Sequence, residues 1–350
     1  MGKKYVINGK FLADRMQGIV RYAREITKAL DKCLDGDIEV TLLAPIDAKD
    51  IPDLKNIKVE TIGKHTGMVW EQTDLRKYLK KHKDVTCINF CNICPLFVQP
   101  GITTIHDIMY KVNPQDYKTI RNRLSRYWHM FQYWYITRHE KAITTVSNFS
   151  KGEIEKYYPH ARGKITVIPN GWQHVLEYKE SPDWQERYPF LKPKEYFFSL
   201  STLSRNKNGK WIIENAKYNP DCVYAIAGKY YETDKFEIPE NVHMLGFISD
   251  EDACALIKNC RAFIHPSLYE GFGLPPLEAL ALGAEVIASN TTALPEVLGE
   301  SVYYIEPSEW TVDFEELLMQ SVGSREQVIE KFNWEKSAEV LLKIMRKKTV

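Results

Sequence analysis

Short, β-rich apolar runs recur along the 350-residue chain, and this repetition constrains its fold most. Amphipathic stretches with a helical period separate many of them, for example residues 24–33 and 249–260. Strand patterns that alternate with helical patterns predict an α/β protein with parallel sheets. The runs are residues 4–9, 38–45, 57–63, 85–90, 103–108, 142–147 and 164–170 in the first half, and 196–202, 223–228, 242–247, 262–267, 285–289 and 302–307 in the second.

Thirteen strands are too many for one ordinary sheet, and 350 residues are many for one hydrophobic core. We therefore expect two doubly wound, Rossmann-like sheets in tandem. The predicted domains are residues 1–172 and 173–333, with the join near 169–172 or in the polar stretch up to Lys194. The basic C-terminal helix, 334–350, is expected to pack back on the first domain.

Charge is distributed unevenly along the chain. Residues 1–172 hold 28 basic and 18 acidic side chains, a formal charge of +10, whereas residues 173–350 carry −9. The first half is therefore expected to face something anionic, such as membrane headgroups, a lipid-linked phosphate or nucleic acid. No signal peptide, myristoylation pattern or membrane-spanning run is recognised, and the seven cysteines favour reduced thiols. We expect a cytoplasmic location. If the basic half contacts lipid, the protein would be peripheral at the inner face of a membrane.

Residues 262–289 form the most informative unit: a strand pattern, a Gly-Phe-Gly turn, a helix that starts with two prolines and ends before Gly283, and another strand pattern. The helix N-terminus suits a phosphate group, and the glycines allow a ligand close to the backbone. Glu278 could accept hydrogen bonds from a ribose, and Glu270 from a sugar hydroxyl. Spacing alone leaves open that both glutamates are simply solvated.

This region, HPSLYEGFGLPPLEALALGAEVIASNTTALPEVLGE, is similar to the C-terminal signature of the retaining glycosyltransferases of family 4, which have the GT-B fold. Further segments match in order: MQGIVRYARE, MVWEQTDL, TTIHDI, TTVSNFSKGEI, ITVIPNGW, SLSTLSRNKNGKWII, YAIAGKYY and VHMLGFISDED. The resemblance implies two Rossmann-like domains with a cleft between them. It also implies transfer of a hexose, with retained configuration, from a nucleoside-diphosphate sugar to a glycan or lipid-linked glycan in cell-surface polysaccharide or lipopolysaccharide synthesis.

The same resemblance assigns roles to individual residues. Glu278 is expected to bind the ribose hydroxyls and Glu270 the donor hexose, while Lys207, helped by Arg205, neutralises the diphosphate. His106 follows a strand pattern and is expected at the donor sugar. The remaining expected contacts are backbone N–H groups of Phe272, Gly273 and Leu274, the acceptor-side loop at Gly18, and Phe247 and Ile248 beside the base.

Several alternatives compete with this assignment. Asp35-Gly-Asp37 and Asp250-Glu-Asp252 could hold a metal, but they are better explained as a turn and an acidic helix start, so no metal or other cofactor is predicted. The spacing of Cys87, Cys91 and Cys94 matches a radical-SAM iron–sulfur site, although buried thiols are the simpler explanation. The first strand lacks the glycine-rich loop of a nicotinamide dehydrogenase. A non-catalytic nucleotide-sugar-binding protein stays open, and no nucleic-acid-binding module is recognised.

Residues 111–141 combine basic and aromatic side chains and suggest contact with an anionic membrane. The alternative is that the aromatic side chains pack on the domain's own sheet. The residues concerned are Lys118, Arg121, Arg123, Arg126, Tyr127, Trp128, Phe131, Tyr133, Trp134 and Tyr135.

Overall fold

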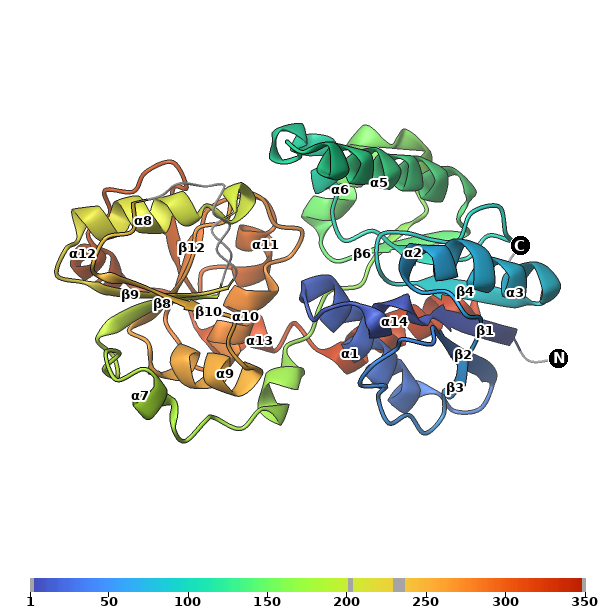
Figure 1. The fold of residues 1–350 in the computed structure, drawn as a ribbon, viewed down its shortest axis with the longest axis horizontal. Helices are drawn as coiled ribbons and strands as arrows, with labels where there is room; N and C mark the ends of the chain where they lie inside the picture. The colour runs from blue at the N-terminus through green and yellow to red at the C-terminus, as the bar shows by residue number, and fades with distance from the viewer. Residues whose placement is uncertain (1–2, 201–203, 229–236, 348–350) are drawn as a thin grey trace. The chain divides into compact units, whose positions relative to one another are not determined.

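The computed structural model describes residues 3–200, 204–228 and 237–347. Residues 201–203 and 229–231, parts of two of the motifs quoted above, lie outside the described residues. The chain forms two compact units (Figure 1): unit 1 comprises Met1–Gly171 and Asn333–Val350, and unit 2 comprises Trp172–Phe332. Within the described residues, no helix combines the length and hydropathy needed to cross a bilayer.

Unit 1 is built on a seven-stranded parallel sheet with the order β3-β2-β1-β4-β5-β6-β7. Its strands are β1 (Lys3–Asn8), β2 (Ile38–Ala44), β3 (Lys58–Thr61), β4 (Val85–Asn89), β5 (Ile102–Thr104), β6 (Ala142–Thr145) and β7 (Ile165–Val167). The chain runs from β1 toward one edge and then from β4 toward the other. The switch point of this sheet, where doubly wound folds bind ligands, therefore lies at the carboxyl ends of β1 and β4.

The helices of unit 1 lie between several of these strands, and the last one follows unit 2 in the chain. They are η1 (Gly9–Ala13), α1 (Gly18–Cys33), α2 (Gly67–Trp70), η2 (Glu71–Leu75), α3 (Arg76–Lys81), α4 (Met109–Val112), η3 (Pro114–Asp116), α5 (Ile120–His139), α6 (Asn148–Tyr157), η4 (Pro159–Ala161) and α14 (Trp334–Arg346). The last of these, α14, returns to pack on α1. Its carboxyl end is tied down because Lys3 Nζ donates to the carbonyls of Met345, Arg346 and Lys347 at 2.6–2.9 Å.

Unit 2 is built on a six-stranded parallel sheet with the order β10-β9-β8-β11-β12-β13. Its strands are β8 (Tyr196–Leu200), β9 (Val223–Ala227), β10 (Val242–Gly246), β11 (Ala262–His265), β12 (Val286–Ser289) and β13 (Tyr303–Ile305). Its helices are η5 (Gln173–Glu177), α7 (Trp184–Arg187), η6 (Arg205–Lys207), α8 (Gly209–Tyr218), α9 (Asp250–Asn259), α10 (Leu274–Ala281), α11 (Leu294–Leu298), α12 (Phe314–Leu318) and α13 (Arg325–Ile329). Here the switch point lies at the carboxyl ends of β8 and β11.

The predicted α/β class with doubly wound parallel sheets is confirmed, and each of the thirteen apolar runs overlaps a strand. In inner strands such as β8 and β12, burial on both faces explains the consecutive apolar residues, whereas the edge strand β3 is partly exposed and carries Lys58 and Glu60. In unit 2, Phe197, Trp211, Tyr224 and Phe314 form the aromatic centre of one core cluster.

Candidate active site

Lys207 and Glu270 meet at the switch point of the unit 2 sheet. Lys207 lies in η6 after β8, and Glu270 lies in the turn after β11. Lys207 Nζ donates to Glu270 Oε1 at 2.6 Å, and His265 Nε2 lies 2.9 Å from the same oxygen. The prediction from sequence named Lys207 and Glu270 but not their direct contact, and it missed His265, the last residue of β11.

The electrostatics of this cluster favour an ionised carboxylate. Burial opposes the charge of Glu270, but Lys207 and His265 together hold the pKa of that carboxyl well below its usual range. The Glu270 side chain is 12% exposed, whereas that of Lys207 is 29% exposed. Lys207 therefore neutralises a buried anion and at the same time keeps access to solvent, which suits a group that binds a charged ligand.

The Gly-Phe-Gly turn delivers the chain to the start of α10. Gly273 adopts the left-handed conformation with φ +95°, and a Cβ there would collide with the side chain of Leu294. Phe272 and Leu274 are buried, so they can offer a ligand their backbone N–H groups but little side-chain surface. Pro275 and Pro276 lack N–H groups, so among the first three residues of α10 only Leu274 carries a backbone donor.

The predicted end of this helix is also confirmed. Gly283 has φ +87°, its N–H donates to the Leu280 carbonyl, and the N–H of Ala284 donates to the Ala279 carbonyl. These two bonds form a Schellman motif, which needs a residue with positive φ at this position.

Glu278, one turn into α10, has a partner that the sequence did not reveal. His174 Nε2, from η5, lies 2.7 Å from Glu278 Oε1. The His174 side chain is 1% exposed and that of Glu278 is 13% exposed. His174 thus fixes one carboxylate oxygen of Glu278 and orients that carboxylate. His174 and Glu278 form the second histidine–glutamate pair of unit 2, after His265 and Glu270.

The other unit 2 predictions fall on short segments that follow strands. Arg205 is exposed in η6, two residues before Lys207. Phe247 and Ile248 follow the carboxyl end of β10, and Phe247 is 76% exposed. An exposed aromatic ring at this edge of the sheet offers a surface on which a base can stack.

In unit 1, His106 lies just after β5 and is buried. Its Nε2 lies 2.7 Å from the carbonyl oxygen of Phe90, and the ring of Tyr22 packs edge-on at 4.8 Å. Burial lowers the pKa of His106 to about 4, so the ring is neutral at pH 7. Because Phe90 supplies an acceptor, Nε2 carries the proton and Nδ1 is left as an acceptor. Gly18 begins α1, one turn before Tyr22.

Unit 1 also contains a cluster of three buried polar side chains, Asn8, Glu71 and Asn89, at its switch point, and the sequence did not predict it. Asn8 ends β1 and Asn89 ends β4, and Asn8 Nδ2 donates to Glu71 Oε1 at 2.6 Å and to Asn89 Oδ1 at 3.0 Å. Glu71 is fully buried, and burial raises the pKa of its carboxyl. It begins a π-helical turn, η2, a local geometry often found at functional sites.

The motifs considered as metal sites have other partners. Asp35 and Asp37 form the predicted turn before β2 and pair with Arg346 of α14. Asp252 lies in the acidic first turn of α9 and pairs with Arg187. Across residues 3–200, 204–228 and 237–347, no group of three or more His, Cys, Asp or Glu is arranged to hold a metal ion.

The iron–sulfur alternative fits the structure poorly. Cys87 and Cys94 are buried, and burial raises the pKa of both thiols well above the usual value. The pKa of the Cys91 thiol is raised to about 12 for the same reason. Cluster ligation needs thiolates, and these surroundings favour thiols.

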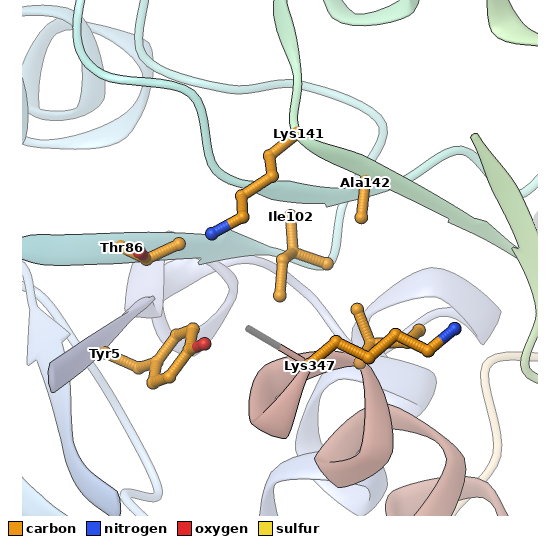
Figure 2. A pocket seen from close by; sticks show the side chains of 7 residues that line it. Tyr5, Thr86, Ile102, Lys141, Ala142 and Lys347 are labelled. Atoms are coloured by element: carbon orange, nitrogen blue, oxygen red, sulfur yellow. The ribbon is translucent and has the colours of Figure 1, made fainter. Parts of the chain in front are cut away.

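A small cavity of about 140 Å³ lies elsewhere in unit 1 (Figure 2). It is lined by Tyr5, Thr86, Ile102, Lys141, Ala142, Ile344 and Lys347. Ile102 and Ala142 are the first residues of β5 and β6, so this cavity lies at the amino edge of the sheet. His106 and the Asn8–Glu71–Asn89 group lie at the opposite edge, and the cavity is therefore not part of the candidate site.

Two family models match the chain. The model described as Glycosyltransferase Family 4 matches residues 16–173, and the model described as Glycosyl transferases group 1 matches residues 180–331. The chain belongs to glycosyltransferase family 4. The predicted family is thus confirmed, and its group 1 segment contains Lys207, Glu270 and Glu278.

Relatives and solved structures support the same family and fold. The O-antigen chain mannosyltransferase B of Escherichia coli is 29% identical over 240 residues, which cover 61% of this chain and 59% of that protein. The O-antigen chain mannosyltransferase RfbU of Salmonella typhimurium is 27% identical over 65% of this chain and 62% of that protein. The matches thus span about three fifths of the length of these curated relatives. Sucrose-phosphate synthase from Thermosynechococcus elongatus superposes with a TM-score of 0.73 at 16% identity and covers 99% of this chain and 98% of that one. The predicted GT-B fold is confirmed.

Proposed function

We propose that this family 4 protein is a retaining hexosyltransferase that moves a sugar from a nucleoside-diphosphate donor to a glycan or lipid-linked glycan in cell-surface polysaccharide synthesis. The observation that carries the proposal is the Lys207–Glu270–His265 cluster beside the turn that starts α10. It combines a partly exposed cation and an oriented carboxylate with nearby backbone donors, at the edge where parallel sheets bind nucleotides.

The donor's parts correspond to the parts of this cluster. We assign the diphosphate to Lys207 and the backbone N–H groups of Gly273 and Leu274, with Arg205 nearby in sequence. Glu278, oriented by His174, is assigned to the ribose hydroxyls, and Glu270 to a hydroxyl of the transferred sugar. Phe247 and Ile248 are assigned to the base. His106 keeps its predicted role at the donor sugar as a neutral imidazole with one free acceptor nitrogen.

For the reaction we propose attack from the face that the diphosphate leaves. The bond from the anomeric carbon to the phosphate oxygen breaks, the acceptor hydroxyl oxygen bonds to that carbon, and the hydroxyl proton passes to the departing phosphate. Glu270 is poorly suited to act as a covalent nucleophile, since its Oε1 is engaged by both Lys207 and His265. Lys207 and the helix start would supply the positive field, without a metal ion.

The names of the relatives suggest mannose as the transferred sugar, because two of them are O-antigen mannosyltransferases. A cytoplasmic location is proposed as well, since all seven cysteines are free thiols.

The test is a thermal-shift screen of the whole chain against GDP-, UDP-, ADP- and dTDP-sugars, followed by a transfer assay with the stabilising donor. We expect one donor, GDP-mannose on the mannose proposal, to raise the melting temperature and to be consumed with an acceptor glycan. Proton NMR of the product then reports the anomeric configuration. Stabilisation without turnover on any offered acceptor would instead favour a nucleotide-sugar-binding protein, and an inverted product would refute retention.

A further inference from the structure

The outward face of α5 is apolar although its inward face already packs in the core. Tyr133 and Ile136 are fully buried and share a hydrophobic cluster with Ile143 of β6 and Ile165 of β7. A surface helix normally shows a polar face to water. Instead, large apolar side chains recur on α5 at spacings of three and four residues, which places them along one stripe. The stripe consists of Ile120, Leu124, Tyr127, Phe131 and Trp134, with exposed fractions of 78%, 66%, 61%, 39% and 43%.

The charged side chains of α5 itself all have the same sign. Helix α5 has no acidic residue anywhere between Ile120 and His139. Arg121 and Arg123 are exposed beside the stripe, and the Arg138 guanidinium lies over the Trp134 ring at 4.8 Å. The outward face of α5 therefore carries exposed aromatic rings next to at least three cations. The position of α5 in unit 1 is labelled in Figure 1.

The structure also changes which of the residues predicted to contact an anionic membrane are able to do so. Tyr133 and Tyr135 are buried, and the Tyr135 hydroxyl accepts from the Phe97 N–H. Arg126 is partly buried and its Nε donates to the Tyr110 carbonyl at 2.8 Å. These side chains face the protein, whereas Ile120, Leu124 and Arg138, which the sequence prediction left out, belong to the outward face.

We propose that the outward face of α5 docks on the surface of an anionic lipid bilayer. Charge complementarity selects this occupant, because arginines beside Trp, Tyr and Phe suit the boundary between headgroups and acyl chains. A second copy presenting the same face would bring arginines against arginines, with no acidic residue of α5 to neutralise them. From Ile120 to Trp134 the stripe extends about 21 Å along the helix, enough to lie flat on a membrane.

The proposal does not depend on the transfer reaction and is tested without a donor. The full chain is sedimented with vesicles of phosphatidylcholine alone or with added phosphatidylglycerol, at low and high salt. We expect binding to the anionic vesicles only, and clear weakening at high salt. Replacing Arg121, Arg123 and Arg138 by Gln should weaken binding about hundredfold, since each basic residue near such a surface contributes about fivefold. Replacing Leu124, Tyr127 and Phe131 by Ser should weaken it as well, which charge attraction alone would not produce.

Matched controls lie on other exposed parts of unit 1. Ile46→Ser with Ile51→Ser removes exposed apolar side chains, and Lys80→Gln with Lys81→Gln and Lys83→Gln removes three exposed charges. Both controls should bind vesicles like wild type, and all variants should keep the wild-type circular dichroism spectrum. The proposal is overturned if neutral vesicles bind equally well, if no vesicles bind, or if a control loses as much affinity as the α5 variants. A dimer that dissociates when the stripe is changed to Ser would assign the face to a second copy and would also overturn it.

Discussion

The contact between Lys207 and Glu270 allows a sharp test of whether this pair belongs to an active site or only holds two loops together. Lys207→Met keeps most of the aliphatic stem and removes the cation. Glu270 then stays buried with His265 as its remaining partner in this cluster. Loss of one member of a buried pair costs about 3–5 kcal/mol. Lys207 is partly exposed and His265 remains, so we expect a smaller loss of about 2 kcal/mol.

That loss is measurable by thermal unfolding. For a unit of this size it corresponds to a melting temperature lower by about 4–8 °C. Glu270→Gln keeps an amide oxygen that can accept from Lys207 and His265 but removes the negative charge, and it should cost about 1 kcal/mol. The double variant removes both charges, so its stability should return to within about 1 kcal/mol of wild type. Its transfer rate should stay as low as that of the worse single variant. Removing both charges relieves the unpaired buried carboxylate, but it does not restore the cation and the carboxylate that we assign to the donor.

A matched control pair lies in the same unit. Lys217 and Glu214 in α8 form an ion pair of 3.3 Å, with side chains 43% and 27% exposed. Lys217→Met, Glu214→Gln and their double variant should each change stability by no more than about 0.5 kcal/mol and leave transfer unchanged. A double variant of Lys207 and Glu270 that recovers both stability and transfer rate would show that the pair is structural. Unchanged stability in Lys207→Met would show that the pair does not form in solution.

Three further outcomes are expected. Glu278→Gln should weaken donor binding by about 1–3 kcal/mol in calorimetry, with Glu251→Gln on α9 as an unaffected control; equal affinities would remove Glu278 from the site. Transfer should survive EDTA, whereas complete loss restored by Mn²⁺ or Mg²⁺ would require a metal site. The pKa of His106 is about 4 in the folded protein and about 6.5 in the unfolded chain, so the unfolded chain binds the extra proton first as the pH falls. The free energy of unfolding should therefore fall by about 3 kcal/mol between pH 6.5 and pH 4. His106→Gln should flatten that part of the stability–pH curve, and an unchanged slope would contradict the assignment.

Local sequence signals predicted the fold because each is decided by neighbouring residues. Apolar runs bounded by turns become strands wherever both sheet faces are covered. Gly283 ends α10 because its positive φ is required by the two bonds that close the helix. The same local logic placed Pro275 and Pro276 in the first turn of that helix.

The partners in the site were not predictable in the same way, since they depend on long-range packing. His174 lies 104 positions before Glu278, and Glu71 lies 63 positions after Asn8. No periodicity links such residues, and only the packing of separate elements at one sheet edge brings them together. His265 did carry a usable signal, because it ends a strand five residues before Glu270, at the edge where side chains of doubly wound sheets converge.

The two switch points hold the same type of residue in opposite electrostatic settings. In unit 1, Glu71 is held by the amides of Asn8 and Gln72, and burial raises its pKa. In unit 2, Glu270 is held by Lys207 and His265, and its pKa is lowered. Glu71 accepts hydrogen bonds from neutral amides, although the charge of Lys10 also acts to lower its pKa, and a carboxyl held in this way is suited to hydroxyl groups. Glu270, in contrast, lies beside a partly exposed lysine, a group that attracts phosphates. This difference favours assigning the charged diphosphate of the donor to unit 2 and a neutral, hydroxyl-rich acceptor to unit 1, an assignment that donor-binding measurements on Glu71→Gln can check. That variant should leave the donor affinity unchanged and raise the KM for the acceptor. A weaker donor affinity with an unchanged KM for the acceptor would contradict this division of roles.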